Sequence, residues 1–298
     1  MNSAYIASII NATLRSTTPI LLAALGSAIC DRVGVFNVAL EAQMLIATFT
    51  SIAVNYFTGS ALLSVLAGVA SGALIGSIVA LLQVKYKAAD MVVGTALNLL
   101  TTATTTFLLY LIFDQRGTLF DPRLVPLTKI NLPIIRDIPF VGRMLENLTI
   151  IDYLCYVIAV ILFIYLFKTV SGFRDLSVGI NKTAAESLGT KATAIQMRMV
   201  ILSGALCGLG GVALSMGQVI MFTENMTSGR GFIAMAASSL GMAHPLITIF
   251  SSLFFGLCQS IGLALQNVIK SQLTAAIPYI ATIVARSEEH TSELQSLG

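Results

Sequence analysis

The sequence predicts an all-α fold, a polytopic bundle of transmembrane helices, from three observations. Apolar residues make up 56% of the 298 residues, charged residues only 10%, and the mean hydropathy is +0.88. A soluble domain has about a quarter charged residues, and this many apolar side chains exceed what one compact core can bury. The apolar residues also gather in long runs, and about twenty residues suffice to cross a bilayer. We expect about seven to nine membrane helices, some of them broken or re-entrant.

Composition and motifs exclude several kinds of function. The formal net charge of +3 is small, and no basic stripe interleaved with aromatic residues is present, so no nucleic-acid partner is expected. The sequence has no Gly-x-x-x-x-Gly-Lys-Ser/Thr loop, no His-Glu-x-x-His pair and no Gly-x-Ser-x-Gly elbow. Its four cysteines lack metal-ligand spacing. We therefore expect no enzyme activity, no ATPase within this chain, no cofactor and no metal site.

The first two apolar runs cover residues 18–30 and 35–57. Pro19 stands near the start of the first run, where a proline disturbs a helix least. Residues 1–11 lack the basic start and the cleavage site of a signal peptide. The first helix should therefore serve as its own insertion signal.

The third run, residues 60–84, is the most uniform span and carries glycines at four-residue intervals. This spacing places them on one helix face, and small residues let two helix backbones approach closely in lipid. A later run, residues 199–220, is also rich in glycine. We predict helix-packing faces at Gly68, Gly72, Gly76, Gly204 and Gly208.

Two further runs, residues 91–113 and 150–167, flank the long polar connection 114–149. That connection holds four of the seven prolines, and a loop of this length usually has a function of its own or lies over a mouth. A second polar connection, residues 168–198, follows.

Two segments are too short to cross a bilayer. Residues 232–241 form either a half-helix buried in protein or the start of a kinked span broken at His244 and Pro245. The final run, residues 274–285, has about twelve residues where a span needs about twenty. We interpret this last helix as truncated.

The chain changes character after Ala285, where residues 286–298 become polar and acidic. Translation of a common sequencing adapter gives the first eleven of these residues in order. A solvated cytoplasmic tail is the alternative. We interpret residues 1–285 as one transmembrane domain and residues 286–298 as a non-native tail without bearing on the fold.

Basic residues indicate the orientation. The turn with Lys85 and Lys87 and the connection 168–198 are separated by two spans, so they lie on one side of the membrane. Both are richer in lysine and arginine than the nearly neutral connection 114–149. The positive-inside rule places the connection 168–198 in the cytoplasm and the connection 114–149 outside.

The polar break at residues 31–41 is the most unusual feature for its depth. A carboxylate in the bilayer needs a partner or water, so Glu41 should face protein or a cavity. Arg32 is the first candidate for its partner, and Asn37 or helix-end amides are alternatives. We predict a broken helix that lines a central cavity, with an interfacial loop as the alternative.

A short capped helix is predicted within the second polar connection. Asn181 suits the N-cap and Gly189 the C-cap of such a helix. A rigid, exposed helix is suited to a docking partner, and a plain turn is the alternative. Its residues are Asn181, Lys182, Ala184, Ala185, Glu186, Leu188 and Gly189.

Four segments in the same order resemble one family: residues 34–41, 179–189, 203–211 and 229–236. With this set the chain resembles the permease subunits of bacterial ABC importers. The branch is the one that includes ribose-type sugar and branched-chain amino acid permeases, and the nucleoside or simple-sugar permeases are the most similar group within it. The resemblance covers nearly the whole chain up to Ala285.

The resemblance implies a multi-pass permease of the bacterial cytoplasmic (inner) membrane that forms the translocation path for nucleosides or related simple sugars. Separate cytoplasmic ATPase subunits would hydrolyse ATP, with residues 181–188 as the coupling helix seated on them. A second permease, often a longer paralogue, and an extracytoplasmic substrate-binding lipoprotein would complete the importer. The path would include Asn37, Glu41, Arg32 and Asn98.

Two alternatives stay open. A permease for a monosaccharide or a branched-chain amino acid is the alternative within the same family. A stand-alone secondary transporter or channel would instead predict ionisable residues buried in several spans. Only residues 31–41 show such a cluster, which weighs against ion coupling.

Overall fold

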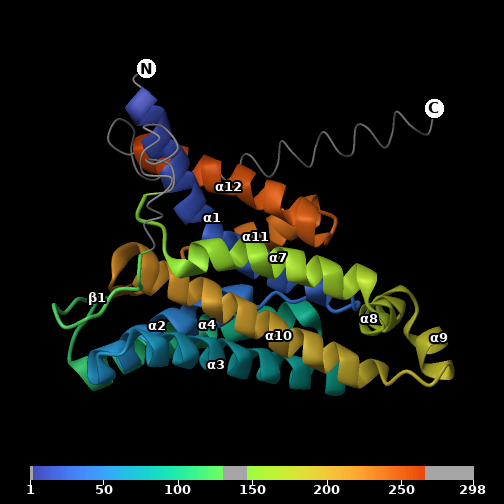
Figure 1. Ribbon diagram of the computed structural model, residues 1–298. Helices are drawn as coiled ribbons and strands as arrows, with labels where there is room; N and C mark the ends of the chain where they lie inside the picture. The colour runs from blue at the N-terminus through green and yellow to red at the C-terminus, as the bar shows by residue number, and fades with distance from the viewer. Residues whose placement is uncertain (1–2, 130–145, 266–298) are drawn as a thin grey trace.

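Long helices make up most of the structure, a computed structural model that describes residues 3–129 and 146–265 (Figure 1). Six of the described helices are long and apolar enough to cross a membrane. They are α1 (Ser3–Asp31), α3 (Ala61–Ala80) with its continuation η1 (Leu81–Lys85), α4 (Asp90–Phe113), α7 (Ile150–Lys168), α10 (Ala192–Val212) with its continuation η2 (Ala213–Val219), and α12 (Pro245–Leu265). The predicted all-α transmembrane bundle is confirmed.

Four other helices in the described part of the chain are shorter or less apolar. They are α2 (Leu40–Thr58), α8 (Val170–Ile180), α9 (Lys182–Ser187) and α11 (Arg230–Leu240). α11 packs against α1, α2 and α12, and a turn at residues 241–244 separates it from α12. It is therefore a half-helix inside the bundle, as one of the two alternatives predicted. With α2 and α11 added to the six long helices, the described residues hold eight helices of the bundle, within the expected range of about seven to nine.

α1 begins well before the apolar run at residues 18–30. The hydroxyls of Thr13, Thr17 and Thr18 donate to carbonyls four residues back, so these polar residues fit a buried helix. Pro19 therefore lies inside the helix, which corrects the expectation that it stands near the start. A proline leaves the carbonyl four residues earlier without its helical donor. Here the amide nitrogen of Gln218 donates to that carbonyl, of Arg15, at 2.6 Å.

α3 and α10 meet through glycines, and the five glycines named above all lie in this contact. A Cβ added at Gly72 would lie 2.7 Å from the Cα of Gly208, and one added at Gly208 would lie 2.8 Å from the carbonyl oxygen of Gly68. Gly76 similarly faces Gly204, at 3.1 Å from an added Cβ to the facing Cα. Larger side chains would push the two backbones apart.

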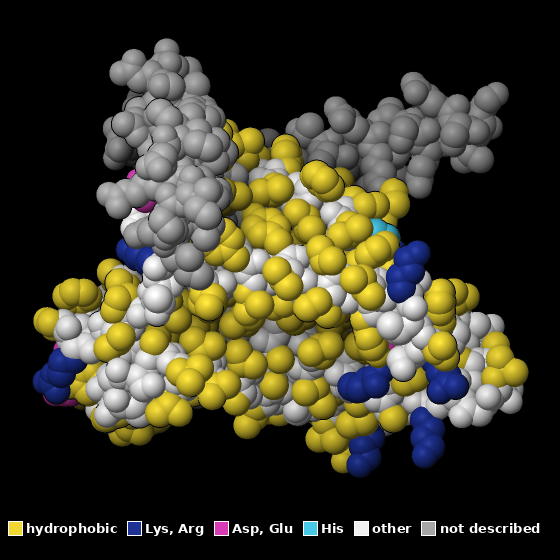
Figure 2. Space-filling model, in the orientation of Figure 1, with side chains coloured by type: hydrophobic (Ala, Val, Ile, Leu, Met, Phe, Trp, Pro, Cys, Tyr) yellow, Lys and Arg dark blue, Asp and Glu magenta, His cyan; other side chains and the backbone are white. Residues whose placement is uncertain are grey.

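The outer helices expose apolar side chains. In α1 89% of the most apolar stretch is buried, against 28% in α3 and 22% in α4. The exposed large side chains of α3 and α4 include Leu66 and Leu99. Figure 2 shows apolar side chains spread over the middle of the molecule, with lysine and arginine gathered toward its ends. Such a surface is suited to lipid, and the protein is a multi-pass membrane protein.

The two ends of the bundle carry different elements (Figure 1). At one end, the ribbon end, β1 (Thr118–Leu119) pairs antiparallel with β2 (Phe222–Thr223). The opposite end, the α9 end, carries α8 and α9. The predicted last helix, residues 274–285, and the tail, residues 286–298, lie outside the described residues and stay predictions.

Candidate functional site

The connection between α1 and α2 is not helical over residues 35–38, and the buried side chain of Asn37 holds it in place. The side-chain oxygen of Asn37 accepts from the backbone N–H of Ala39 at 3.1 Å. Its amide nitrogen donates to Ser203 Oγ at 3.2 Å and to Gln43 Oε1 at 3.3 Å. Asn37 is buried, so these bonds satisfy its amide without solvent.

Asn98 reaches the same connection from α4. Its side-chain oxygen accepts from the backbone N–H of Ala42 at 2.9 Å, and its amide nitrogen donates to the carbonyl of Val38 at 3.1 Å. The first N–H groups of a helix have no partner within the helix. Asn98 therefore caps α2 from a neighbouring helix.

Glu41 lies in the first turn of α2, buried, and faces the first turn of α11. Its two carboxylate oxygens accept from the backbone N–H groups of Gly229, at 2.8 Å, and Gly231, at 2.6 Å. Free N–H groups and the helix dipole make a helix N-terminus a favourable partner for an anion. The partner of Glu41 is thus a pair of helix-end amides.

Glycines allow this contact. A Cβ added at Gly231 would lie 2.5 Å from the backbone nitrogen of Glu41 and 2.8 Å from its Cα. Gly229 has φ of 80°, in the left-handed region that favours glycine. Because the start of α11 is rich in glycine, its backbone N–H groups can approach the Glu41 carboxylate and hydrogen-bond to it directly.

Arg32 is not the partner of Glu41, which corrects the first expectation. Its guanidinium donates to the carbonyls of Ala243 and Met242, each at 2.9 Å, and lies 5.4 Å from the centre of the Phe167 ring. These carbonyls follow the C-terminal end of α11, whereas Glu41 holds the N-terminal end. One helix length therefore separates the two charged groups.

His244 completes the turn that Arg32 holds. Its ring stacks in tilted geometry on Phe163 and Phe167, with centroids 5.4 and 4.9 Å apart. Burial, and then the nearby Arg32 guanidinium, lower the pKa of His244 below its usual value. The neutral imidazole is therefore the favoured form beside Arg32.

α9 is a short capped helix at the α9 end of the bundle. The side-chain oxygen of Asn181 accepts from the backbone N–H of Ala184 at 3.0 Å. Gly189 follows the helix with φ of 84°, and its N–H donates to the carbonyl of Glu186. Leu188 is 87% exposed and Ile180 is 86% exposed, so apolar side chains flank the helix.

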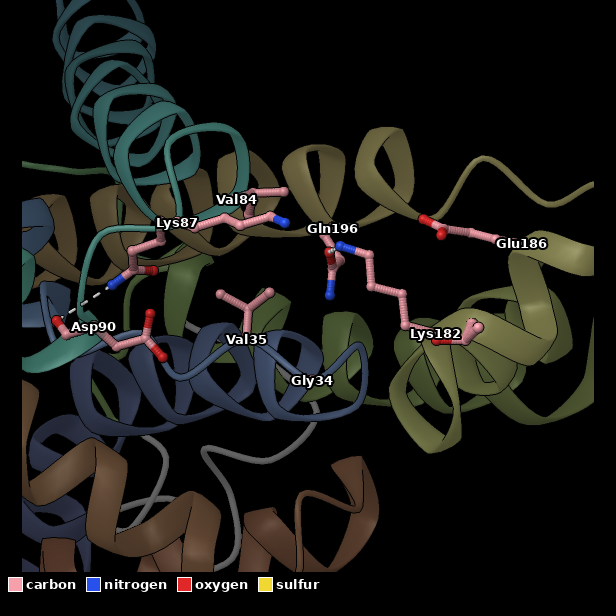
Figure 3. A pocket seen from close by; sticks show the side chains of 10 residues that line it. Gly34, Val35, Val84, Lys87, Asp90, Lys182, Glu186 and Gln196 are labelled. Carbon is pink, nitrogen blue, oxygen red and sulfur yellow. Dashed lines mark hydrogen bonds between the residues drawn. The ribbon is translucent and has the colours of Figure 1, made fainter.

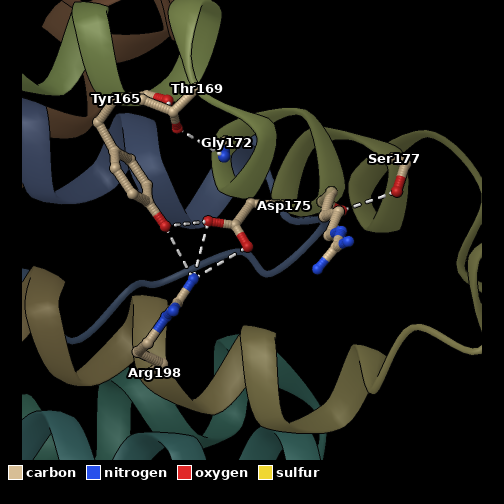
Figure 4. Close-up of polar contacts among 7 residues, drawn as sticks. Tyr165, Thr169, Gly172, Asp175, Ser177 and Arg198 are labelled. Atoms are coloured by element: carbon tan, nitrogen blue, oxygen red, sulfur yellow. Dashed lines mark hydrogen bonds and ion pairs between the residues drawn. The ribbon is translucent and has the colours of Figure 1, made fainter.

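α8 is anchored to α7 and α10 by a buried carboxylate that the sequence did not reveal (Figure 4). Asp175 is 1% exposed; it accepts from the Tyr165 hydroxyl at 2.7 Å and from Arg198 Nη2 at 2.9 and 3.0 Å. Thr169 caps α8 by accepting from the N–H of Gly172. These bonds hold the segment that carries α9 against the bundle.

A cavity of about 500 Å³ lies beside α9 (Figure 3). Residues from η1, α4, α9 and α10 and from two connections line it, among them Gly34, Gln83, Lys87, Lys182 and Gln196. Lys87 from the 85–87 turn and Lys182 from α9 thus lie at one end of the bundle. This arrangement agrees with the prediction that the turn with Lys87 and the connection 168–198 lie on the same side of the membrane.

Comparison with known proteins places this architecture in a family. The model of the family described as branched-chain amino acid transport system / permease component matches residues 9–285. The chain belongs to this family of membrane permease components. No solved structure is significantly similar to it.

Individual relatives are more specific. The chain is 36% identical over 289 residues to the guanosine ABC transporter permease NupQ of Bacillus subtilis, covering 93% of this chain and 90% of that protein. It is 33% identical over 280 residues to the nucleoside ABC transporter permease NupC of Lactococcus lactis, covering 90% and 87%. It is also 27% identical over 304 residues to a putative glucose ABC transporter permease of Haloferax volcanii, covering 95% and 92%.

Proposed function

We propose that this chain is the membrane-spanning subunit of an ABC importer, forming the translocation path for nucleosides, and that separate ATPase subunits drive it. The observation that carries the proposal is α9, a capped helix held outside the apolar spans. The relatives described above carry the name of permease subunits of such transporters.

α9 is the proposed docking helix for an ATPase subunit. Leu188 and Ile180 expose large apolar surfaces beyond the apolar spans, and an exposed apolar patch commonly marks a protein interface. Glu186 adds an exposed charge to the same short helix. The Asp175–Arg198 pair would keep the docking helix from moving independently of the bundle.

The proposed path runs past the start of α2, near Asn37, Glu41 and Asn98. Two discontinuous helices, α2 and α11, meet there through their N-terminal turns. Discontinuous helices whose N-termini point into the site are typical of substrate sites in transporters. Arg32 borders this region through the other end of α11.

Nucleosides are the proposed substrate because two of the relatives named above are nucleoside or guanosine permeases. A monosaccharide is the alternative that the glucose relative favours. Ion coupling is less favoured: among the described residues, the buried carboxylates of Glu41, Asp152 and Asp175 already accept hydrogen bonds from protein groups, as does the partly buried Asp31.

The proposed assembly contains two permease subunits, two ATPases and an extracytoplasmic substrate-binding lipoprotein in the bacterial inner membrane. Similarity to two different permeases of Lactococcus lactis, NupC and NupB at 33% and 28% identity, supports a pair of related subunits. The basic α9 end would face the cytoplasm and the ribbon end the outside.

The docking assignment is tested by Glu186→Lys in the complete transporter reconstituted in nanodiscs. Charge reversal on α9 should lower ATP hydrolysis stimulated by the loaded binding protein about fivefold or more. Glu146→Lys is the matched control, because Glu146 is also exposed but lies away from the α9 end. This variant should leave the stimulation of ATP hydrolysis unchanged. Full stimulation in the Glu186 variant, with normal co-purification of the ATPase, would refute the assignment.

A further inference from the structure

Gln196 connects the docking helix to the polar break between α1 and α2. It lies near the start of α10 and is 7% exposed. Its side-chain oxygen accepts from Lys182 Nζ at 3.0 Å, and its amide nitrogen donates to the carbonyl of Val33 at 3.0 Å. Figure 3 shows Lys182 and Gln196 pointing toward one another across the cavity.

Direct packing supports the same connection. A Cβ added at Gly179, two residues before the N-cap of α9, would overlap the carbonyl oxygen of Arg32 and approach the Cα of Val33 at 3.2 Å. Backbone therefore rests on backbone where α8 ends and the break begins. A displacement of α9 cannot leave residues 32–33 unaffected without opening this contact.

The break in turn holds α11 along its length. Glu41 binds the N–H groups of Gly229 and Gly231 at one end of α11, and Arg32 binds the carbonyls of Met242 and Ala243 just past the other. Between them, Ser238 donates to Asp31 Oδ2 at 3.2 Å. α11 is thus attached at three places to one segment, residues 31–41.

The turn that Arg32 holds has an unfavourable backbone. Met242 and Ala243 have φ of 50° and 51°, in the left-handed region that is strained for residues other than glycine. The two charge-assisted bonds from Arg32 offset part of that strain. The position of α11 therefore depends on where residue 32 lies.

We propose that Gln196 is a positioning residue that transmits displacement of α9 to α11 through residues 32–41. The proposal rests on the proposed function, in which α9 receives the motion of the ATPase. The cavity beside Gln196 leaves room for Lys182 to move without expelling packed side chains. α11 is then the element of the path that responds to nucleotide binding.

The test compares Gln196→Met, which keeps the length of the side chain and removes both hydrogen bonds, with Gln218→Met. Gln218 lies at the opposite end of the same long helix, and its amide also donates to a backbone carbonyl of α1, that of Arg15. Each variant therefore loses one side-chain bond to a backbone carbonyl. Gln196→Met also loses the bond to Lys182, and only Gln196 lies on the proposed connection. Two further variants are measured, Lys182→Met and the double variant that combines Lys182→Met with Gln196→Met.

Two readouts are measured on the complete transporter, the first in nanodiscs and the second in proteoliposomes, which enclose a volume into which substrate can be taken up. The first is hydrogen exchange of the peptide covering residues 230–240, with and without a non-hydrolysable ATP analogue and with no substrate. The second is nucleoside taken up per ATP hydrolysed. In the wild type and in Gln218→Met the analogue should change exchange of this peptide, whereas in Gln196→Met the change should fall about fivefold or more, with a similar loss of uptake per ATP.

The double variant should behave as Gln196→Met does, because Lys182 acts through Gln196 in this account. Additive losses, or an analogue response of Gln196→Met equal to that of Gln218→Met, would overturn the proposal. So would an absence of any response at residues 230–240 in the wild type. If the wild type carries no nucleoside but the exchange pattern is as expected, the proposed substrate fails and the connection stands.

Discussion

The carboxylate of Glu41 organises the meeting point of two discontinuous helices. A buried carboxylate is costly unless its oxygens are hydrogen-bonded. Glu41 meets this condition with two backbone N–H groups at the start of α11, where the helix dipole also favours negative charge. One side chain therefore fixes both the first turn of α2 and the position of α11.

At the residue scale, Glu41→Gln should destabilise the protein by about 1–3 kcal/mol. The new amide group would place an N–H donor against the N–H of Gly229 or Gly231, so one buried bond is lost. Thermal unfolding in detergent measures the effect as a lower midpoint. The matched control is Glu224→Gln, because Glu224 accepts from the N–H of Gly117 at the less buried ribbon end. Equal midpoints for the two variants would contradict this role of Glu41.

The sequence predicted the polar break and the need of Glu41 for a partner. It did not predict which partner, because Arg32 is near Glu41 along the chain and Gly229 is far from it. The non-helical backbone after α1 carries Glu41 away from Arg32 and toward α11. The family resemblance includes Asn98 in the expected path, but its role as a cap of α2 is visible only in three dimensions.

At the element scale, the crossing of α3 and α10 depends on glycine. Spacing in the sequence was sufficient to predict a packing face on α3, because a repeat of four residues returns to one side of a helix. The identity of the facing helix needed the structure, which sets Gly204 and Gly208 of α10 against that face.

Gly72→Ala should destabilise the bundle by about 1–3 kcal/mol, because the added methyl group lies 2.7 Å from the Cα of Gly208 and only backbone can give way. Ala70→Leu adds more volume to the exposed side of the same helix and should change stability little. Unfolding midpoints of both variants in the same detergent test this expectation. A larger loss for Ala70→Leu would show that α3 does not pack as described.

The anchor of α8 is the element that sequence reasoning missed. Asp175 and Arg198 belong to different helices, so no helical spacing connects them. Both lie in the connection 168–198, which the sequence predicts to be polar, and a carboxylate in such a connection is normally solvated. The structure instead buries Asp175 against Tyr165 and Arg198.

Arg198→Met should loosen α8 and α9, because it leaves Asp175 buried with the Tyr165 hydroxyl as its remaining side-chain donor among the described residues. The cost should fall below the roughly 3–5 kcal/mol of a fully buried pair, because the Arg198 side chain is 57% exposed. Hydrogen exchange of residues 170–187 in the full chain should become faster. Arg174→Met, at an exposed position of α8, is the control. Unchanged exchange in Arg198→Met would mean that the pair does not hold α8.

At the scale of the whole molecule, composition was enough to predict a helical membrane bundle, because lipid-facing surface requires apolar residues whatever the packing. Helix boundaries were less predictable. α1 extends through polar threonines that bond to their own backbone, and its internal proline is compensated by Gln218 from a distant helix. Such long-range compensation leaves no pattern in the sequence.

Hydrogen bonds and the polar break also connect the proposed docking helix to the proposed substrate path. α9 lies at one end, the paired N-termini of α2 and α11 lie inside the bundle, and the polar break joins them through Val33, Arg32 and Glu41. In an ABC importer, movement of the ATPase has to reach the substrate path. In this bundle a continuous set of bonded groups runs from α9 to the N-termini of α2 and α11.

Uptake by the complete transporter in proteoliposomes tests directly whether this chain belongs to an ATP-driven nucleoside importer. Labelled guanosine, ribose and leucine are supplied outside the vesicles together with the binding protein. ATP is enclosed inside the vesicles, on the side that the ATPase subunits face. We expect guanosine to accumulate against its gradient only when ATP is hydrolysed, and ribose and leucine not to accumulate. Uptake of leucine or ribose in place of guanosine would contradict the proposed substrate. Uptake of guanosine without ATP hydrolysis would contradict the proposed class of transporter.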